Sequence, residues 1–129
     1  MAEQVAKFRF LNFSISESHF KIEPSEVTDF SLDINVDQTT YENEEEGKMK
    51  LELTVMVSDE KKMVDINVKA NGIFEYDKDI DEKTKESFFT LNAPAILFPY
   101  VRAYVSSLTA LSGMPPITLP TINLASTRQ

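Results

Sequence analysis

The chain has 129 residues, and 13 Lys and Arg against 21 Asp and Glu give it a formal net charge of −8. The length fits a single domain over residues 1–129 with a core of its own, and the acidic balance argues against a nucleic-acid partner, which requires an excess of basic side chains. The chain contains no cysteine, which excludes disulfide frameworks, thiolate metal sites and cysteine nucleophiles.

The first strand that the sequence predicts changes phase in its middle. Phe8 and Phe10 share one phase of a period-two pattern, whereas Phe13 and Ile15 share the other. We expect a bulge near Phe10–Leu11, which turns apolar residues to both faces of the sheet. Either this segment forms two short strands with a kink, or it is one strand that also meets a second subunit.

Three further segments alternate apolar and polar residues with a period of two. They cover residues 30–36, 49–57 and 64–70. This period predicts strands with one buried and one wet face, as is common in antiparallel sheets. Residues 42–47 and 58–61 between these segments are rich in turn formers and predict hairpins.

The pattern becomes helical after the fourth predicted strand. Asn71-Gly72, near the end of that strand, predicts a bulge or a bend. Residues 81–91 fit a short helix. Asn92 is placed to cap a second, longer helix over residues 93–112, because asparagine is a favoured N-cap residue.

The long helix is apolar nearly all round, and Arg102 is the only charged residue between Ala93 and Ser112. A helix of this kind is buried on several sides. A membrane span is the first alternative, but a mid-span arginine makes insertion costly, so we expect no membrane insertion. We expect one side of the helix on the sheet and another against a second subunit, with a carboxylate or carbonyl partner for Arg102.

No motif for catalysis or metal binding emerges. His19 is the only histidine, and the acidic residues that begin at Asp77 do not continue as a calcium loop, since Glu82 stands where such a loop needs glycine. The three glycines form no phosphate-binding motif. We therefore expect no enzyme activity, no cofactor and no metal. Nine Phe and four Tyr predict instead an apolar interface or groove.

Three motifs in the chain resemble the SecB family of bacterial export chaperones. Residues 92–102 (NAPAILFPYVR) are similar to the start of that family's long helix, 113–123 (GMPPITLPTIN) to its proline-rich loop, and 71–74 (NGIF) to the end of its fourth strand. The resemblance covers nearly the whole chain in order. It implies an α+β fold, in which a four-stranded antiparallel sheet carries a short and a long helix on one face.

The resemblance also implies an ATP-independent chaperone for protein transport, which holds unfolded or extended polypeptides in apolar grooves. The family assembles as a homotetramer, a dimer of dimers. The groove candidates here are Phe74, Tyr76, Tyr100, Tyr104, Ile117, Leu119 and Ile122. The candidates for the oligomer interface are Phe10, Phe13, Ile15, Val101, Arg102, Val105 and Leu108. Because residues 1–7 lack the pattern of a signal peptide, we expect a cytoplasmic protein.

The surface that the family presents to the SecA motor differs in this chain. The corresponding positions are His19, Glu23, Asp65 and Asn67, of which only Glu23 clearly keeps the expected acid. The sequence ends soon after the segment similar to the proline-rich loop, and we therefore expect a short form that lacks the family's terminal helix and tail. Docking to SecA is therefore doubtful, and short SecB-like proteins that serve other clients, including antitoxins, offer a second model.

Two other functions stay open at this point. The same groove suits a binding protein for a small apolar ligand, which would not suppress the aggregation of a denatured protein. A scaffolding protein, whose apolar helix only builds the oligomer, would have no open groove. The client of a chaperone could be broad or a single dedicated partner.

Overall fold

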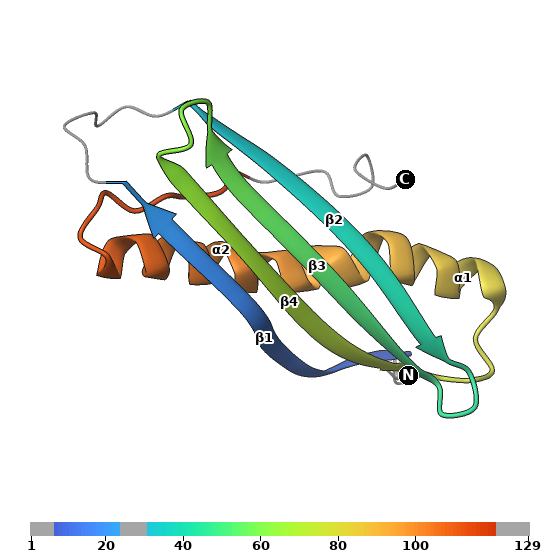
Figure 1. Cartoon of the computed structure of the whole chain (residues 1–129). Coiled ribbons are helices and arrows are strands. Elements are labelled where there is room, and N and C mark those ends of the chain that lie inside the picture. The colour runs from blue at the N-terminus through green and yellow to red at the C-terminus, as the bar shows by residue number, and fades with distance from the viewer. Residues whose placement is uncertain (1–6, 24–30, 121–129) are drawn as a thin grey trace, which may run out of the picture.

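The structure is a computed structural model, and it describes residues 7–23 and 31–120. Four strands form one antiparallel sheet in the spatial order β1-β4-β3-β2, and a long helical segment crosses one of its faces (Figure 1). The strands are β1 (Phe8–Ile22), β2 (Leu32–Asn43), β3 (Lys48–Asp59) and β4 (Val64–Tyr76). This arrangement confirms the predicted α+β fold.

The central strand β3 shows why the period-two pattern predicts the sheet well. Buried and half-buried residues alternate along its whole length. The apolar side chains on its buried face are at most 1% exposed and comprise Met49, Leu51, Leu53, Val55 and Val57. The other face of the sheet carries mainly polar side chains, so one face packs on the helix and the other meets water.

The predicted bulge in β1 is present, but its consequence differs from the expectation. The register with β4 shifts between Phe10 and Asn12, so that Phe10 pairs with Phe74 and Phe13 pairs with Gly72. Since cross-strand partners share a face, the bulge keeps these aromatic residues together on the helix-covered face instead of dividing them between two faces. Leu11 is the extra residue and is 48% exposed.

β1 contains a second bulge that the sequence analysis did not predict. The register shifts again between Ile15 and Glu17, after which Phe20 pairs with Ile66. This shift returns Phe20 and Ile22 to the helix-covered face, where both pack against the core. β1 is therefore one continuous strand with two bulges, not two short strands.

Of the two alternatives expected at Asn71-Gly72, a bulge or a bend, the bulge is absent, since the register of β4 with β3 is unbroken there. Gly72 has a packing role instead. A Cβ at this position would lie 3.2 Å from Leu97 Cδ1 and 3.0 Å from Phe74 Cε1. The glycine thus lets the long helix approach the sheet closely.

The two predicted helices are joined into one continuous helical segment. It consists of α1 (Glu82–Ser87), the π-helical η1 (Phe88–Asn92) and α2 (Ala93–Leu111). The expectation that Asn92 caps a separate helix is wrong, since its backbone is helical and its side chain makes no capping hydrogen bond. The Ala93 amide donates to the Phe88 carbonyl, five residues back, and this wider turn carries the helix past Pro94, which has no amide to donate.

The helix begins at a well-defined cap. Asp81 Oδ2 accepts a hydrogen bond from the Thr84 amide at 3.1 Å, and Oδ1 accepts one from the Thr84 hydroxyl at 2.7 Å. These hydrogen bonds hold the pKa of Asp81 below its ordinary value.

Among the described residues, no helix has the length and apolar character required to cross a membrane.

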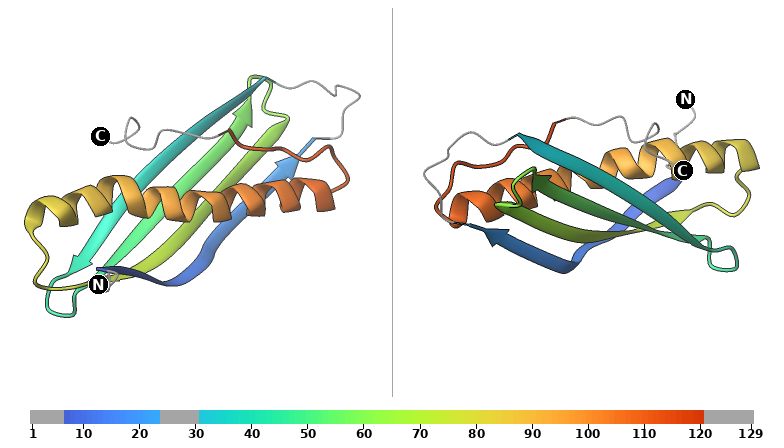
Figure 2. Two further views of the ribbon diagram at one scale, coloured as in Figure 1. Left: turned by 180° about the vertical axis from the view of Figure 1, so that it is seen from behind. Right: turned by 45° about the horizontal axis from the view of Figure 1, so that its top comes forward.

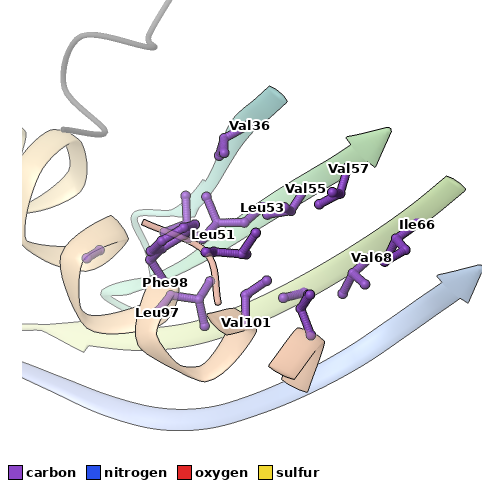
Figure 3. Close-up of a cluster of buried hydrophobic side chains, with 14 of the residues drawn as sticks. Val36, Leu51, Leu53, Val55, Val57, Ile66, Val68, Leu97, Phe98 and Val101 are labelled. Carbon is purple, nitrogen blue, oxygen red and sulfur yellow. The ribbon is translucent and has the colours of Figure 1, made fainter. Parts of the chain in front are cut away.

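The core lies between the sheet and α2. Figure 3 shows side chains from the strands meeting Leu97, Phe98 and Val101 of the helix. Beyond α2, Gly113 adopts a φ of +93° and turns the chain back. The chain then crosses the same face of the sheet as the helix (Figure 2), so two segments cover the sheet.

Candidate functional site

An aromatic strip runs along the rim between α2 and the edge strand β1. We define this strip as Phe10, Phe13, Tyr100 and Tyr104. The ring centroids of Tyr100 and Phe13 lie 4.8 Å apart with stacked planes, and those of Tyr100 and Phe10 lie 5.6 Å apart. The Tyr104 hydroxyl donates to Ser18 Oγ at 2.8 Å. Two elements that are distant in sequence thereby form one apolar surface.

The strip is open to solvent in this protomer. Tyr100 is 45% exposed, while Phe10, Phe13 and Tyr104 are half-buried against the core. β1 pairs with β4 on one side, and its other side pairs with no strand among residues 7–23 and 31–120. The aromatic rings therefore lie beside an open sheet edge.

The predicted groove residues divide into two groups. Tyr100 and Tyr104 lie on the aromatic strip. Four others lie in the core, with exposed fractions of 8% or less: Phe74, Tyr76, Ile117 and Leu119. Their side chains pack inward because they fall on the helix-covered face of β4 or on the segment that follows α2. Ile122 lies outside the described residues.

The predicted interface residues divide in a similar way. Phe10, Phe13 and Ile15 lie half-buried on β1, and Arg102 and Leu108 lie half-buried on α2. In contrast, Val101 and Val105 are 0% exposed and belong to the core, so they present no surface to a second protomer. A helix that is apolar all round gives no phase from which to tell its core side from its outer side.

The partner expected for Arg102 is present. Its Nε donates to the main-chain carbonyl of Leu119 at 3.0 Å. This partner belongs to the same chain and not to a second subunit. The guanidinium therefore ties α2 to the segment that follows it.

The sequence predicted a second, outer side of α2 but did not indicate which residues form it. The side of the helix that faces away from the sheet is exposed and carries no charge. Its residues are Ala95, Ile96, Pro99, Ala103, Ser107 and Ala110. The only signal for this side in the sequence is its lack of charged residues. The buried side of the helix lacks them too, so the signal does not distinguish the two sides.

Three of the four positions that correspond to the SecA-facing surface lie on the outer face of the sheet, and the fourth, Glu23, follows the end of β1. His19, Asp65 and Asn67 line one shallow hollow. His19 Nε2 lies 3.3 Å from Asp65 Oδ2. Within the described part of the chain, no three or more acidic or histidine side chains gather as a metal site.

A polar network closes the opposite end of the sheet. Lys85 Nζ lies 2.8 Å from Glu42 Oε2 and 3.0 Å from Glu82 Oε1, and the Tyr76 hydroxyl also donates to Glu42 Oε2. Burial of the Glu42 carboxyl opposes its ionisation, but the hydrogen bonds from Lys85 and Tyr76 outweigh burial and hold its pKa below the ordinary value. This network joins α1 to the end of β2.

Comparison with known proteins identifies the family. The model of the family described as "Preprotein translocase subunit SecB" matches residues 10–127. The chain belongs to the SecB family. It is 32% identical over 124 residues to the protein-export protein SecB of Orientia tsutsugamushi (strain Boryong), covering 96% of this chain and 76% of that protein. It is also 32% identical over 124 residues to an uncharacterized protein of Methanocaldococcus jannaschii, covering 91% of this chain and 79% of that protein.

The fold agrees with a solved structure of the same kind. The SecB-like chaperone Rv1957 of Mycobacterium tuberculosis, in complex with a ChAD peptide from the HigA1 antitoxin, superposes with a TM-score of 0.77. The match covers 90% of this chain and 91% of that chain at 14% sequence identity. At this identity the likeness shows a shared SecB-like fold.

Proposed function

We propose that this SecB-family protein is an ATP-independent chaperone that holds unfolded or extended polypeptides on the aromatic strip. The observation that carries the proposal is the exposure of Tyr100, 45% open to solvent while its ring stacks on Phe13. Clients of such a chaperone vary in sequence, so recognition rests on apolar burial, at about 25 cal/mol per Å², and not on specific hydrogen bonds. In this proposal the protein has no enzyme activity and acts in the cytoplasm.

A peptide client also fits what is known of a relative. The SecB-like chaperone of M. tuberculosis is in complex with a peptide from an antitoxin. We infer that polypeptide is the ligand class here too. Of the four positions that correspond to the SecA-facing surface, His19, Glu23, Asp65 and Asn67, only Glu23 clearly keeps the expected acid, and we therefore leave the SecA motor out of the proposed partners.

We further propose a homotetramer, built as a dimer of dimers. The open edge of β1 offers main-chain groups for pairing two protomers, because unpaired strand edges readily add a further strand. The uncharged outer side of α2 offers a second contact, since small residues let two helices approach closely. Several strips on one particle would bind a long client more tightly than one strip does.

Suppression of aggregation tests this function. The protein is mixed with a reduced, denatured test polypeptide, and light scattering follows both the aggregation of the client and the mass of the chaperone. We expect the wild-type chain to keep the client soluble as a particle near four times the 14.7 kDa chain. A particle that assembles but lets the client aggregate would contradict the proposal and favour a scaffolding role.

A matched pair of tyrosine variants locates the surface. Tyr100 and Tyr41 are 45% and 51% exposed, but Tyr41 lies on the outer face of the sheet. We expect Tyr100→Ser to require several-fold more protein for the same suppression, whereas Tyr41→Ser behaves as wild type. Equal losses in the two variants would show that the strip is not the binding surface.

A further inference from the structure

The segment after α2 lies in a site that is built for an extended peptide. We call residues 114–120 the strap. Figure 2 shows it running back from the end of α2 across the helix-covered face of the sheet. Ile117 and Leu119 point inward and are 8% and 0% exposed, while Thr118 between them is exposed. This alternation is that of a strand, although the strap pairs with no strand among the described residues.

Side chains of α2 replace the missing strand partner. The Ile117 amide donates to Thr109 Oγ1 at 2.8 Å, and Ser106 Oγ donates to the Ile117 carbonyl at 2.9 Å. One helical turn earlier, Arg102 Nε donates to the Leu119 carbonyl at 3.0 Å. The positions 102, 106 and 109 share one side of the helix, because residues three and four apart are neighbours there.

These three contacts are made to main-chain atoms of the strap. Any extended polypeptide offers the same amide and carbonyl groups at the same spacing, so the hydrogen bonds do not depend on the sequence of the occupant. The site selects its occupant only at the two inward positions, those of Ile117 and Leu119, where it requires apolar side chains. The site thus recognises an extended backbone with two apolar residues at positions i and i+2.

The strap is attached in a way that permits its release. Gly113 precedes it with a φ of +93°, and a Cβ added there would meet no atom within 4 Å. Pro115, Pro116 and Pro120 are exposed, so the strap is held by the three hydrogen bonds, by its two inward side chains and by the half-buried Met114. The prolines also keep the released segment extended, which lowers the entropy cost of returning to the site.

We propose that the strap is an internal pseudo-client: residues 117–119 fill a peptide site on α2, and a client segment with apolar residues two positions apart displaces them. The proposal rests on the proposed chaperone function for its natural occupant. It adds a second binding site, distinct from the aromatic strip, since Tyr100 and Tyr104 face β1 whereas Arg102 and Ser106 face the strap.

Binding of a peptide in trans tests the site without reference to chaperone activity. The probes are a labelled peptide with the sequence of residues 113–120, GMPPITLP, and the control peptide GMPPSTSP. We expect the full-length Leu119→Ser variant, whose strap has lost its most buried side chain, to bind GMPPITLP at least tenfold more tightly than the wild-type chain. It should show no gain for GMPPSTSP. Equal affinity of variant and wild type for GMPPITLP would overturn the proposal.

Two neighbouring serines give a matched control for the hydrogen bonds. Ser106 donates to the strap, whereas Ser107 is exposed on the outer side of α2. In the Leu119→Ser background, Ser106→Ala should weaken the binding of GMPPITLP several-fold, and Ser107→Ala should leave it unchanged. The same effect from both would show that the peptide does not occupy the strap site.

Hydrogen exchange in the wild-type chain gives a test that needs no variant to fold. The Ile117 amide should be protected, because it donates to Thr109 Oγ1. An excess of reduced, carboxymethylated α-lactalbumin should speed its exchange at least tenfold, while amides of β3 keep their protection. If the client is held and Ile117 stays protected, the strap proposal fails and the chaperone function stands. If the client is not held, the chaperone function fails, and the affinities for the two peptides decide the strap site.

Discussion

The ammonium group of Lys85 lies 2.8 Å from Glu42 Oε2, which ties the first turns of the helical segment to the end of strand β2. The lysine side chain is only 11% exposed, and it also lies 5.4 Å from the centre of the Tyr76 ring. Glu82 supplies a second carboxylate at 3.0 Å. Three elements that are separate in sequence therefore meet at Lys85, whose own side chain is largely shielded from water, although the Glu82 side chain is 86% exposed.

The variant Lys85→Met tests the contribution of this ion pair to stability. Methionine keeps the apolar stem but leaves Glu42 and Glu82 without their cation. We expect the free energy of unfolding to fall by about 1–2 kcal/mol, as measured by urea denaturation, because hydrogen bonds to charged groups contribute on this scale. The control is Lys83→Met on the exposed side of the same helix, for which we expect a change within about 0.5 kcal/mol. Equal effects of the two variants would contradict this role.

Ionisation of Tyr76 is expected to lower the stability of the fold at alkaline pH. Burial and the hydrogen bond to the Glu42 carboxylate raise the pKa of Tyr76 to about 12, from an ordinary value of 10.0. A pKa that is higher in the folded state contributes stability that is complete below pH 10 and is lost as the pH rises towards 12. We therefore expect the urea midpoint of the wild-type chain to fall more between pH 9 and pH 11.5 than that of Tyr76→Phe. The same decrease in both proteins would rule out Tyr76 as the cause.

The sheet is predictable because its signals are local. Alternation with a period of two shows the strands directly, and the change of phase between Phe10 and Phe13 locates the first bulge. The second bulge carries the same kind of signal, since Ile15 and Phe20 also differ in phase, but the polar residues between them resemble a bend. The sequence does not show that both bulges keep the apolar residues on one face, because this depends on the pairing with β4.

The candidate site is only half predictable, for a physical reason. Tyr100 and Val101 are adjacent and both apolar, yet one is 45% exposed and the other is 0% exposed. A helix without a charged stripe offers no pattern from which to separate these two sides. Ile117 and Leu119 are groove candidates by their apolar character, but their place in the core depends on main-chain hydrogen bonds to α2 that no sequence pattern indicates.

The outer side of α2 allows a direct test of the proposed tetramer. Ala103 is exposed in the middle of this uncharged side. If two protomers meet there about a two-fold axis, an arginine at this position lies close to its own copy, and the like charges separate the dimers. We expect light scattering to show four chains per particle for the wild type and two for Ala103→Arg. The control is Thr39→Arg, at an exposed position on the outer face of β2. This variant should keep four chains per particle. A particle of unchanged mass for Ala103→Arg, in a protein of unchanged urea stability, would show that this side of the helix does not join the dimers.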